Sequence, residues 1–201
     1  MNINLQKGQK IDLTKGRVGL SKILVGLGWD PISAANGFFK GLFSGISSDF
    51  DCDVSVLMLD SNGKLLGDES LIYYGHLKSS CGSVTHTGDN LTGDGKGDNE
   101  QIIIELDKIP QQYNKLIFVV NIFDCLKRKQ HFGLIKNAFI RIADVSANQE
   151  LVRFNLSEKN EDQTTLFAGE IYRHDGEWKF EATGNATAHT SLNEIIKEYE
   201  Y

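Results

Sequence analysis

Short apolar runs separated by glycine and asparagine constrain the fold of this 201-residue chain more than any other feature. The runs are rich in β-branched and aromatic residues, which favour strands. Residues 61–64 (SNGK) and 174–178 (HDGEW) have the composition of tight hairpin-type turns. The sequence therefore predicts a mainly β protein, a β-sandwich of two packed sheets. The expected strands are 22–29, 53–60, 70–75, 101–109, 115–124, 137–144, 150–156, 165–174 and 177–184.

Helical signals are few, and the clearest one is at the C-terminus. In residues 191–200 (SLNEIIKEYE), Ser191 is the expected N-cap and Glu194 follows three residues later, which is a capping box. No proline- and serine-rich linker and no repeat of fixed period divides the chain. We expect a single domain over residues 1–201, with a few short helices and a glycine- and phenylalanine-rich insertion at 36–48.

Charge and cysteine content limit the classes of function. A net charge of −6 argues against nucleic-acid binding, which needs a basic surface for the phosphates. Cys52, Cys81 and Cys125 are odd in number and widely spaced, which fits a reducing compartment. The chain has no apolar stretch of transmembrane length, and its first residues lack the apolar core of a secretory signal. We therefore expect a cytoplasmic protein.

The stretch 88–100, GDNLTGDGKGDNE, has the composition of a cation-binding loop. Its glycines allow sharp backbone turns, and its side chains are rich in oxygen, which calcium binds with six to eight ligands. An EF-hand is excluded, because Leu91 and Gly93 occupy ligand positions and a strand-like run, not a helix, follows. The candidate calcium ligands of this loop are Asp89, Asn90, Asp94, Asp98, Asn99 and Glu100.

A second acidic segment, DFDCD, occupies residues 49–53. In an extended conformation, Asp49, Asp51 and Asp53 share one face, with the intervening side chains on the other. Three like charges on one face are unfavourable unless they are paired or bind a metal. Taken alone, the segment fits a solvated strand edge equally well. The presence of both acidic segments favours a calcium site.

Several of these segments resemble the TerD family, the tellurium-resistance and general-stress proteins of bacteria. LGWD, DFDCD, GSVTHTGDNLTGDGKGDNE, KNAFIRI, FNLSE and GEIYRHDGEWKF occur here in the family's order. Residues 121–139 and the glycine- and phenylalanine-rich insertion at 36–48 are most similar to the TerZ and YceC type of member. The resemblance covers nearly the whole chain. It implies a calcium-binding β-sandwich that acts in tellurite and related stress resistance, without established catalysis. The metal ligands it marks are Asp49, Asp51, Asp53, Asp89, Asn90, Asp98, Glu100 and Asp30.

This sequence departs from the family pattern at three positions. Asn99 replaces the second aspartate of a GDDE-like motif, Lys96 stands where an acidic residue is common, and Cys81 replaces an aspartate. Each change removes negative charge near the loop. Because ligand charge tunes calcium affinity, we expect weaker binding than in a typical member, or one site filled instead of two.

The resulting hypothesis is a calcium-binding stress protein that acts as an interaction module, not as an enzyme, with other stress-response or TerD-like proteins as partners. No catalytic residue is assigned. One alternative is a metal-dependent hydrolase with His86, the histidine placed to touch the acidic site, as the base. Another is a calcium-dependent membrane-docking module.

Residues 36–48 either cover the protein's own sandwich or contact a partner or a membrane surface. Arg141 and Arg153 either pair with the acidic face or are solvated.

Overall fold

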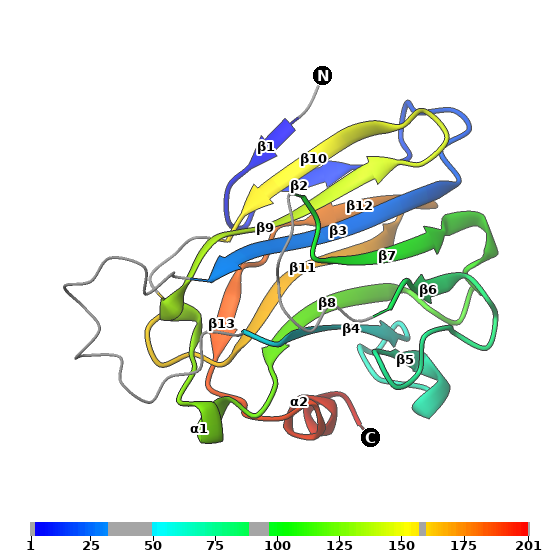
Figure 1. Cartoon of the computed structure of the whole chain (residues 1–201). Coiled ribbons are helices and arrows are strands. Elements are labelled where there is room, and N and C mark those ends of the chain that lie inside the picture. Colours follow the sequence, from blue (N-terminus) through cyan, green and yellow to red (C-terminus); the bar gives the residue numbers. More distant parts are fainter. Residues whose placement is uncertain (1–2, 32–49, 89–96, 157–159, 201) are drawn as a thin grey trace.

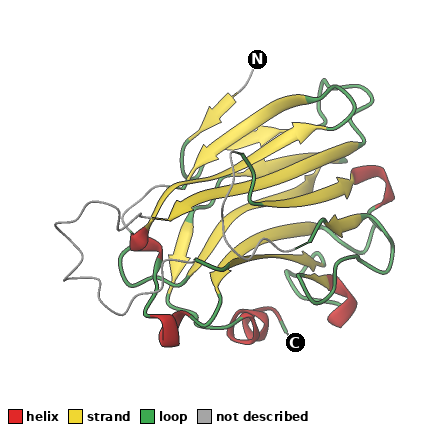
Figure 2. Cartoon of the chain, in the orientation of Figure 1, coloured by secondary structure: helices red, strands yellow, loops and turns green. Residues whose placement is uncertain are grey.

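Two β-sheets lie face to face in the computed structural model (Figure 1), which describes residues 3–31, 50–88, 97–156 and 160–200. Strands dominate, and the helices are short and lie at the margins (Figure 2). The expected mainly β sandwich is confirmed. The insertion expected at 36–48 lies outside the described residues, and the single-domain assignment stays a prediction. Among the described residues, no helix is both long and apolar enough to cross a membrane.

The first sheet has six strands, and its strand order separates neighbours in the sequence. Its strands pair in antiparallel fashion, except that β1 runs parallel to β10. Strands β9 and β3 are therefore the central pair, β7 lies next to β3, and β6 closes one edge. In spatial order the strands are β1 (Ile3–Leu5), β10 (Gln149–Asn155), β9 (Ile135–Asp144), β3 (Lys22–Pro31), β7 (Glu100–Glu105) and β6 (Val84–His86).

The second sheet has seven strands and pairs in antiparallel fashion throughout the described residues. Asp175 and Gly176 join β11 to β12 with positive φ angles of 54° and 79°, the backbone of a two-residue hairpin turn. In spatial order the strands are β2 (Lys10–Asp12), β12 (Glu177–Glu181), β11 (Thr165–His174), β8 (Lys115–Ile122), β4 (Cys52–Leu59) and β5 (Leu71–Ile72), with β13 (Asn185–Thr187) paired to β11.

The main core lies between the two sheets, because alternate residues of each strand point inward. Strand β4 shows the pattern: Cys52, Val54, Val56 and Met58 are buried in this core. The intervening residues of β4 face outward. A second apolar cluster therefore forms on the outer face of the second sheet, where Leu57 and Leu59 pack with Ile195 and other side chains of the C-terminal helix.

The C-terminal helix, α2 (Leu192–Tyr199), begins where its capping signal places it. Ser191 has an extended backbone, and its Oγ accepts a hydrogen bond from the Glu194 N–H at 3.4 Å. The Glu194 carboxylate accepts a hydrogen bond from the Thr190 N–H at 2.8 Å. In the usual capping box it accepts from the N–H of the N-cap residue itself, which here is Ser191. A second helix, α1 (Cys125–Arg128), is a single turn after β8.

Candidate metal centre: the acidic loop and its anchors

The acidic loop connects β6 to β7, and its base is a closed hairpin. The Thr87 N–H and Oγ1 both donate to the Gln101 carbonyl oxygen, at 3.0 and 3.1 Å. Four of the predicted ligands, Asp49, Asp89, Asn90 and Asp94, lie outside the described residues. The described part of the site is therefore the base of the loop, together with the start of β4.

His86 contacts both ends of the loop. Its Nε2 lies 2.9 Å from Glu100 Oε2, and each of the two side chains is 1% exposed. The Gly88 N–H donates to His86 Nδ1 at 3.1 Å. Since Nδ1 accepts a hydrogen bond, the proton of a neutral imidazole is on Nε2, which lies close to the carboxylate but without the geometry of a hydrogen bond. The ring thus joins the first residue of the loop to the last one.

Asp98 lies against an arginine. The Arg141 Nε and an Arg141 terminal nitrogen each donate to one carboxylate oxygen, both at 2.6 Å, and Gln101 adds a third hydrogen bond at 3.0 Å. The Asp98 side chain is 1% exposed. Its hydrogen bond and charge raise the pKa of Arg141 above the usual value. A calcium ion would have to compete with this guanidinium for Asp98.

Two glycines of β3 make room for the end of the loop. A β-carbon on Gly26 would lie 2.3 Å from the Asp98 carboxylate. A β-carbon on Gly28 would lie 2.4 Å from the Phe139 ring and 2.7 Å from the Gly97 carbonyl oxygen. Since real β-carbons do not approach this closely, larger residues would displace the loop or the ring. The glycine pair in 26–28 is a sequence signal of this contact that the predicted site did not include. A glycine inside a strand often marks close approach of another segment.

Asn99 continues the pairing of the loop with β3. Its N–H donates to the Leu27 carbonyl oxygen, and its Oδ1 accepts from the Trp29 N–H, both at 2.7 Å. The amide oxygen that the sequence offers as a ligand is thus bonded to the backbone of β3. Asn99 and Asp98 together fix the end of the loop on the first sheet.

Three other predicted ligands lie within electrostatic reach of one buried thiol, although Asp53 faces the opposite side of β4 from Cys52. Cys52 is fully buried, and burial raises its pKa well above the usual value; the negative charges of Asp53, Asp51 and Glu100 raise it further. Asp51 also has an ion-pair contact, 3.4 Å from an Arg128 terminal nitrogen. Carboxylates from the two acidic segments of the sequence therefore converge within electrostatic reach of Cys52.

The remaining predicted ligand, Asp30, lies at the end of β3. It is exposed, and it accepts a hydrogen bond from Asn137 Nδ2 at 2.8 Å. In the part of the chain that the structure describes, no three His, Cys, Asp or Glu side chains are grouped to hold a metal ion. The calcium site stays a prediction, and a complete one would need ligands from beyond the described residues.

The outer face of the first sheet carries a row of alternating charges. Besides Asp98, Arg141 lies 3.7 Å from Glu150, which forms two hydrogen bonds of 2.9 Å with Arg153. The Arg153 guanidinium lies over the Phe139 ring, 4.1 Å from its centroid. Arg141 pairs with Asp98 of the acidic loop, as one of the two interpretations has it, whereas Arg153 pairs with Glu150, which lies outside both acidic segments.

The chain matches known proteins along its length. The TerD domain profile matches residues 1–199. Stress response protein SCP2 of Bacillus subtilis (strain 168) is 57% identical, covering 99% of this chain and 100% of that protein. Tellurium resistance proteins TerD and TerZ of Serratia marcescens are 44% and 37% identical, covering 94% and 96% of this chain and 92% and 94% of their own lengths.

A solved structure shares the fold. The crystal structure of a homologue of telluride resistance protein (TerD) from Streptomyces coelicolor A3(2) superposes with a TM-score of 0.64. The match covers 89% of this chain and 95% of that chain at 19% sequence identity, so it supports the architecture alone. The profile match and the sequence identities, in contrast, establish descent. This chain belongs to the TerD family.

Proposed function

We propose that this protein is a calcium-binding stress-response protein of the tellurite-resistance type, and that it acts as an interaction module, not as an enzyme. The names of its relatives support the physiological role, because they are stress response and tellurium resistance proteins. The calcium proposal depends on the acidic loop and on the buried carboxylates at its base.

The convergence of Asp51, Asp53 and Glu100 on Cys52 is the observation that carries the calcium proposal. Each of these three residues is buried, with at most 8% exposure. Like charges held close together in a buried region disfavour one another unless a cation offsets them. Calcium accepts carboxylates and amide oxygens in flexible arrangements, whereas magnesium demands a small octahedral shell and keeps its waters.

The described residues divide into ligands and anchors under this proposal. Glu100 and Asp51 would hold the ion, together with ligands from the four predicted residues beyond the described part. Asp53 faces the outer side of the second sheet and would contribute through its charge alone. Asp98 and Asn99 instead hold the end of the loop on β3, since their oxygens are bonded to Arg141 and to the Trp29 N–H. Bound calcium would neutralise the loop and fix its surface for a protein partner.

The position of His86 favours binding over hydrolysis. Both ring nitrogens face parts of the loop base, and the residue is 2% exposed. A general base must reach the water or substrate from which it takes a proton. Because His86 is enclosed between Gly88 and Glu100, we assign it the role of joining the loop ends.

Calorimetric titration of the metal-free protein with calcium and with magnesium tests the proposal. Calcium should bind and raise the melting temperature, and magnesium should do so much less. Glu100→Gln keeps the shape of the side chain near His86 but removes one charge, so calcium affinity should fall by roughly tenfold or more.

Asp175→Asn is the matched control, because Asp175 lies on the exposed β11–β12 turn with its side chain 88% exposed. This variant should bind calcium like the unmodified protein. Equal responses to both ions, or an unchanged affinity in Glu100→Gln, would count against a calcium site at the base of the loop.

A further inference from the structure

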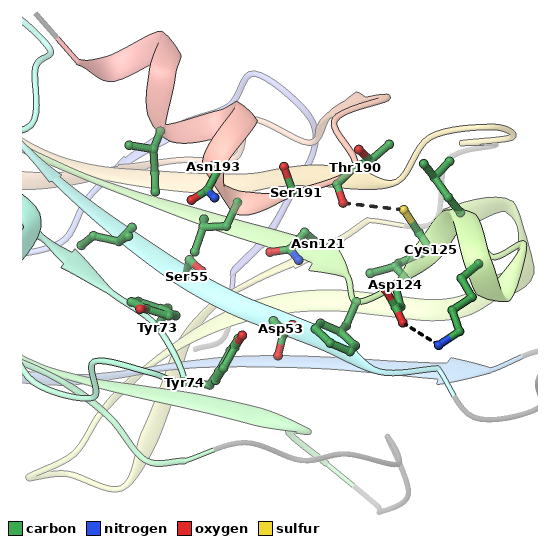
Figure 3. A pocket seen from close by; sticks show the side chains of 17 residues that line it. Asp53, Ser55, Tyr73, Tyr74, Asn121, Asp124, Cys125, Thr190, Ser191 and Asn193 are labelled. Carbon is green, nitrogen blue, oxygen red and sulfur yellow. Dashed lines mark hydrogen bonds and ion pairs between the residues drawn. The ribbon is translucent and has the colours of Figure 1, made fainter.

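A cavity of about 510 Å³ lies on the outer face of the second sheet, beside the start of α2 (Figure 3). We call it the α2 cavity. Its floor carries Asp53 and Ser55 of β4 and Asn121 of β8. Asp53 and Asn121 are directly paired across the two strands, and Ser55 follows on the same face of β4. Three polar side chains are thus gathered on a sheet face that is otherwise apolar beneath α2.

Two of these floor residues have buried oxygens without a protein partner. Ser55 is fully buried and Asn121 is 7% exposed. Ser55 Oγ and Asn121 Oδ1 make no hydrogen bond with any residue that the structure describes. Buried polar atoms in folded proteins are nearly always hydrogen-bonded, because leaving one unsatisfied destabilises the native state. Two such atoms lining one cavity leave acceptors that water or a bound ligand can satisfy.

The charge of the floor selects the kind of ligand. Asp53 contributes a negative charge, and an amide oxygen such as that of Asn121 can only accept hydrogen bonds. Among the described lining residues, the cation is Lys127 at the rim, with its side chain 83% exposed and its Nζ 3.6 Å from Asp124. The negative charge of Asp53 on the floor would therefore repel an anionic ligand. A primary ammonium group carries three N–H donors, and the floor offers a carboxylate, an amide oxygen and a hydroxyl oxygen.

The walls suit an organic cation better than a bare ion. Tyr73, Tyr74 and Phe123 line the cavity, and aromatic faces attract ammonium groups. Tyr74 and Phe123 are 48% and 42% exposed, and Leu126 at the opening is 73% exposed. These apolar surfaces can cover a hydrocarbon chain. A metal ion, in contrast, would find one carboxylate on the floor of a cavity far larger than itself.

We propose that the α2 cavity binds the ammonium group of an aliphatic amine, with Asp53, Ser55 and Asn121 as its three acceptors and with Tyr74 and Phe123 along its hydrocarbon chain. The amine is either a free small molecule or a lysine side chain of a protein partner. This site goes beyond the calcium proposal, because Ser55 and Asn121 belong to neither acidic segment of the sequence and the Asp53 side chain faces away from Cys52 and Glu100.

The test is calorimetric titration with n-pentylamine and with n-pentanol, its neutral counterpart, in calcium-free buffer containing a chelator. The amine should bind and the alcohol should not. Asn121→Leu removes the unpartnered oxygen and keeps the branched shape of the side chain, so amine affinity should fall about tenfold or more. The melting temperature of Asn121→Leu should be unchanged or higher, because a buried unsatisfied group has been replaced by an apolar one. A merely structural role for Asn121 would instead lower the melting temperature.

Ser55→Ala should also weaken amine binding, whereas Ser61→Ala, on the exposed turn after β4, is the matched control and should not. The proposal is overturned if n-pentylamine does not bind the unmodified protein, or if Asn121→Leu binds it equally well. It is also overturned if Asn121→Leu loses the response to calcium, since the cavity would then belong to the calcium site. Loss of calcium binding in Glu100→Gln with amine binding intact would leave this proposal standing.

A second pair of probes separates the two sources of the ammonium group. A blocked pentapeptide with a central lysine is compared with the same peptide carrying norleucine. Tighter binding of the lysine peptide than of n-pentylamine supports recognition of a protein partner, whereas tighter binding of n-pentylamine supports a free amine. Equal binding of the lysine and norleucine peptides, together with equal binding of amine and alcohol, would overturn the proposal.

Discussion

The polar side chains on the outer faces of the two sheets differ in whether they have hydrogen-bond or ion-pair partners within the described chain. On the first sheet, Asp98 and Glu150 each contact an arginine, and the row continues across β9 and β10. On the second sheet, α2 covers an apolar cluster, and beside it Ser55 and Asn121 have oxygens with no partner among the described residues. A polar group satisfied by its own chain serves the fold. A buried polar group that is not satisfied by its own chain is available to water or to a ligand.

The largest expected effect comes from breaking the charge row. Arg141→Met leaves the Asp98 carboxylate, which is 1% exposed at its side chain, without its guanidinium. Removing one partner of a buried ion pair costs about 3–5 kcal/mol, because the other charge stays buried and uncompensated. Urea unfolding at neutral pH measures this loss.

Two further variants sharpen the result for Arg141. Adding Asp98→Asn to Arg141→Met should recover much of the stability, since the buried charge is then gone. Arg153→Met breaks the more exposed pair with Glu150, whose side chains are 30% and 20% exposed, and should cost roughly 1 kcal/mol or less. Equal losses in Arg141→Met and Arg153→Met would mean that burial does not distinguish the two pairs.

A smaller effect is expected on the second sheet, where apolar packing replaces ion pairs. Ile195→Ala removes the fully buried side chain by which α2 packs on Leu57 and Leu59. Truncation of a buried isoleucine to alanine costs about 2–4 kcal/mol. Chemical denaturation gives the loss, and hydrogen exchange should show α2 opening before the sheets. Exchange that is unchanged in α2 but faster in β7 and β9 would contradict the separation of the two faces.

The sequence predicted the elements with strong local signals and missed the short ones. Runs such as 115–122 and the cap at Ser191 became β8 and α2. Strands β1, β2, β6 and β13 have three residues each, and such short pieces pair because a neighbouring strand is available, not because of their own composition. Local pattern therefore predicts most of the sandwich but not its edges.

For the candidate site, composition predicted which side chains offer oxygen ligands, but not the hydrogen-bond and ion-pair partners of those oxygens. The Asp98–Arg141 pair joins residues 43 positions apart, which no local motif encodes. The sequence also contains other signals of close contacts and buried polar groups. Gly26 interrupts a strand, and Ser55 and Asn121 are polar residues inside apolar runs, which usually marks a close contact or a buried polar site. Placing these signals in space required the fold.

The smallest expected effect is a pH dependence at the end of α2. Burial raises the pKa of Tyr199 from 10.0 to about 12, and the negative charges of Glu198 and Glu170 add to the shift. The folded protein therefore holds this phenol neutral at pH values where the unfolded chain already releases the proton. Its contribution to stability is complete below about pH 10 and is lost as the pH rises from 10 towards 12. Because Tyr199 is only partly buried, the change should be modest.

Tyr199→Phe removes the ionisable group and keeps the ring, so its unfolding free energy should change less between pH 9.5 and 11 than that of the unmodified protein, as measured by urea unfolding at each pH. Tyr74→Phe is the control, because Tyr74 is 48% exposed and is not one of the side chains of the apolar cluster under α2. It should keep the pH dependence of the unmodified protein. Equal changes in the unfolding free energies of Tyr199→Phe and of the unmodified protein between pH 9.5 and 11 would contradict this prediction. In that case the end of α2 is not packed tightly enough on the sheet to disfavour the ionised form of Tyr199. The apolar half of the second face would then be as open to water as the cavity beside it, and the contrast between the two outer faces would apply to their ion pairs alone.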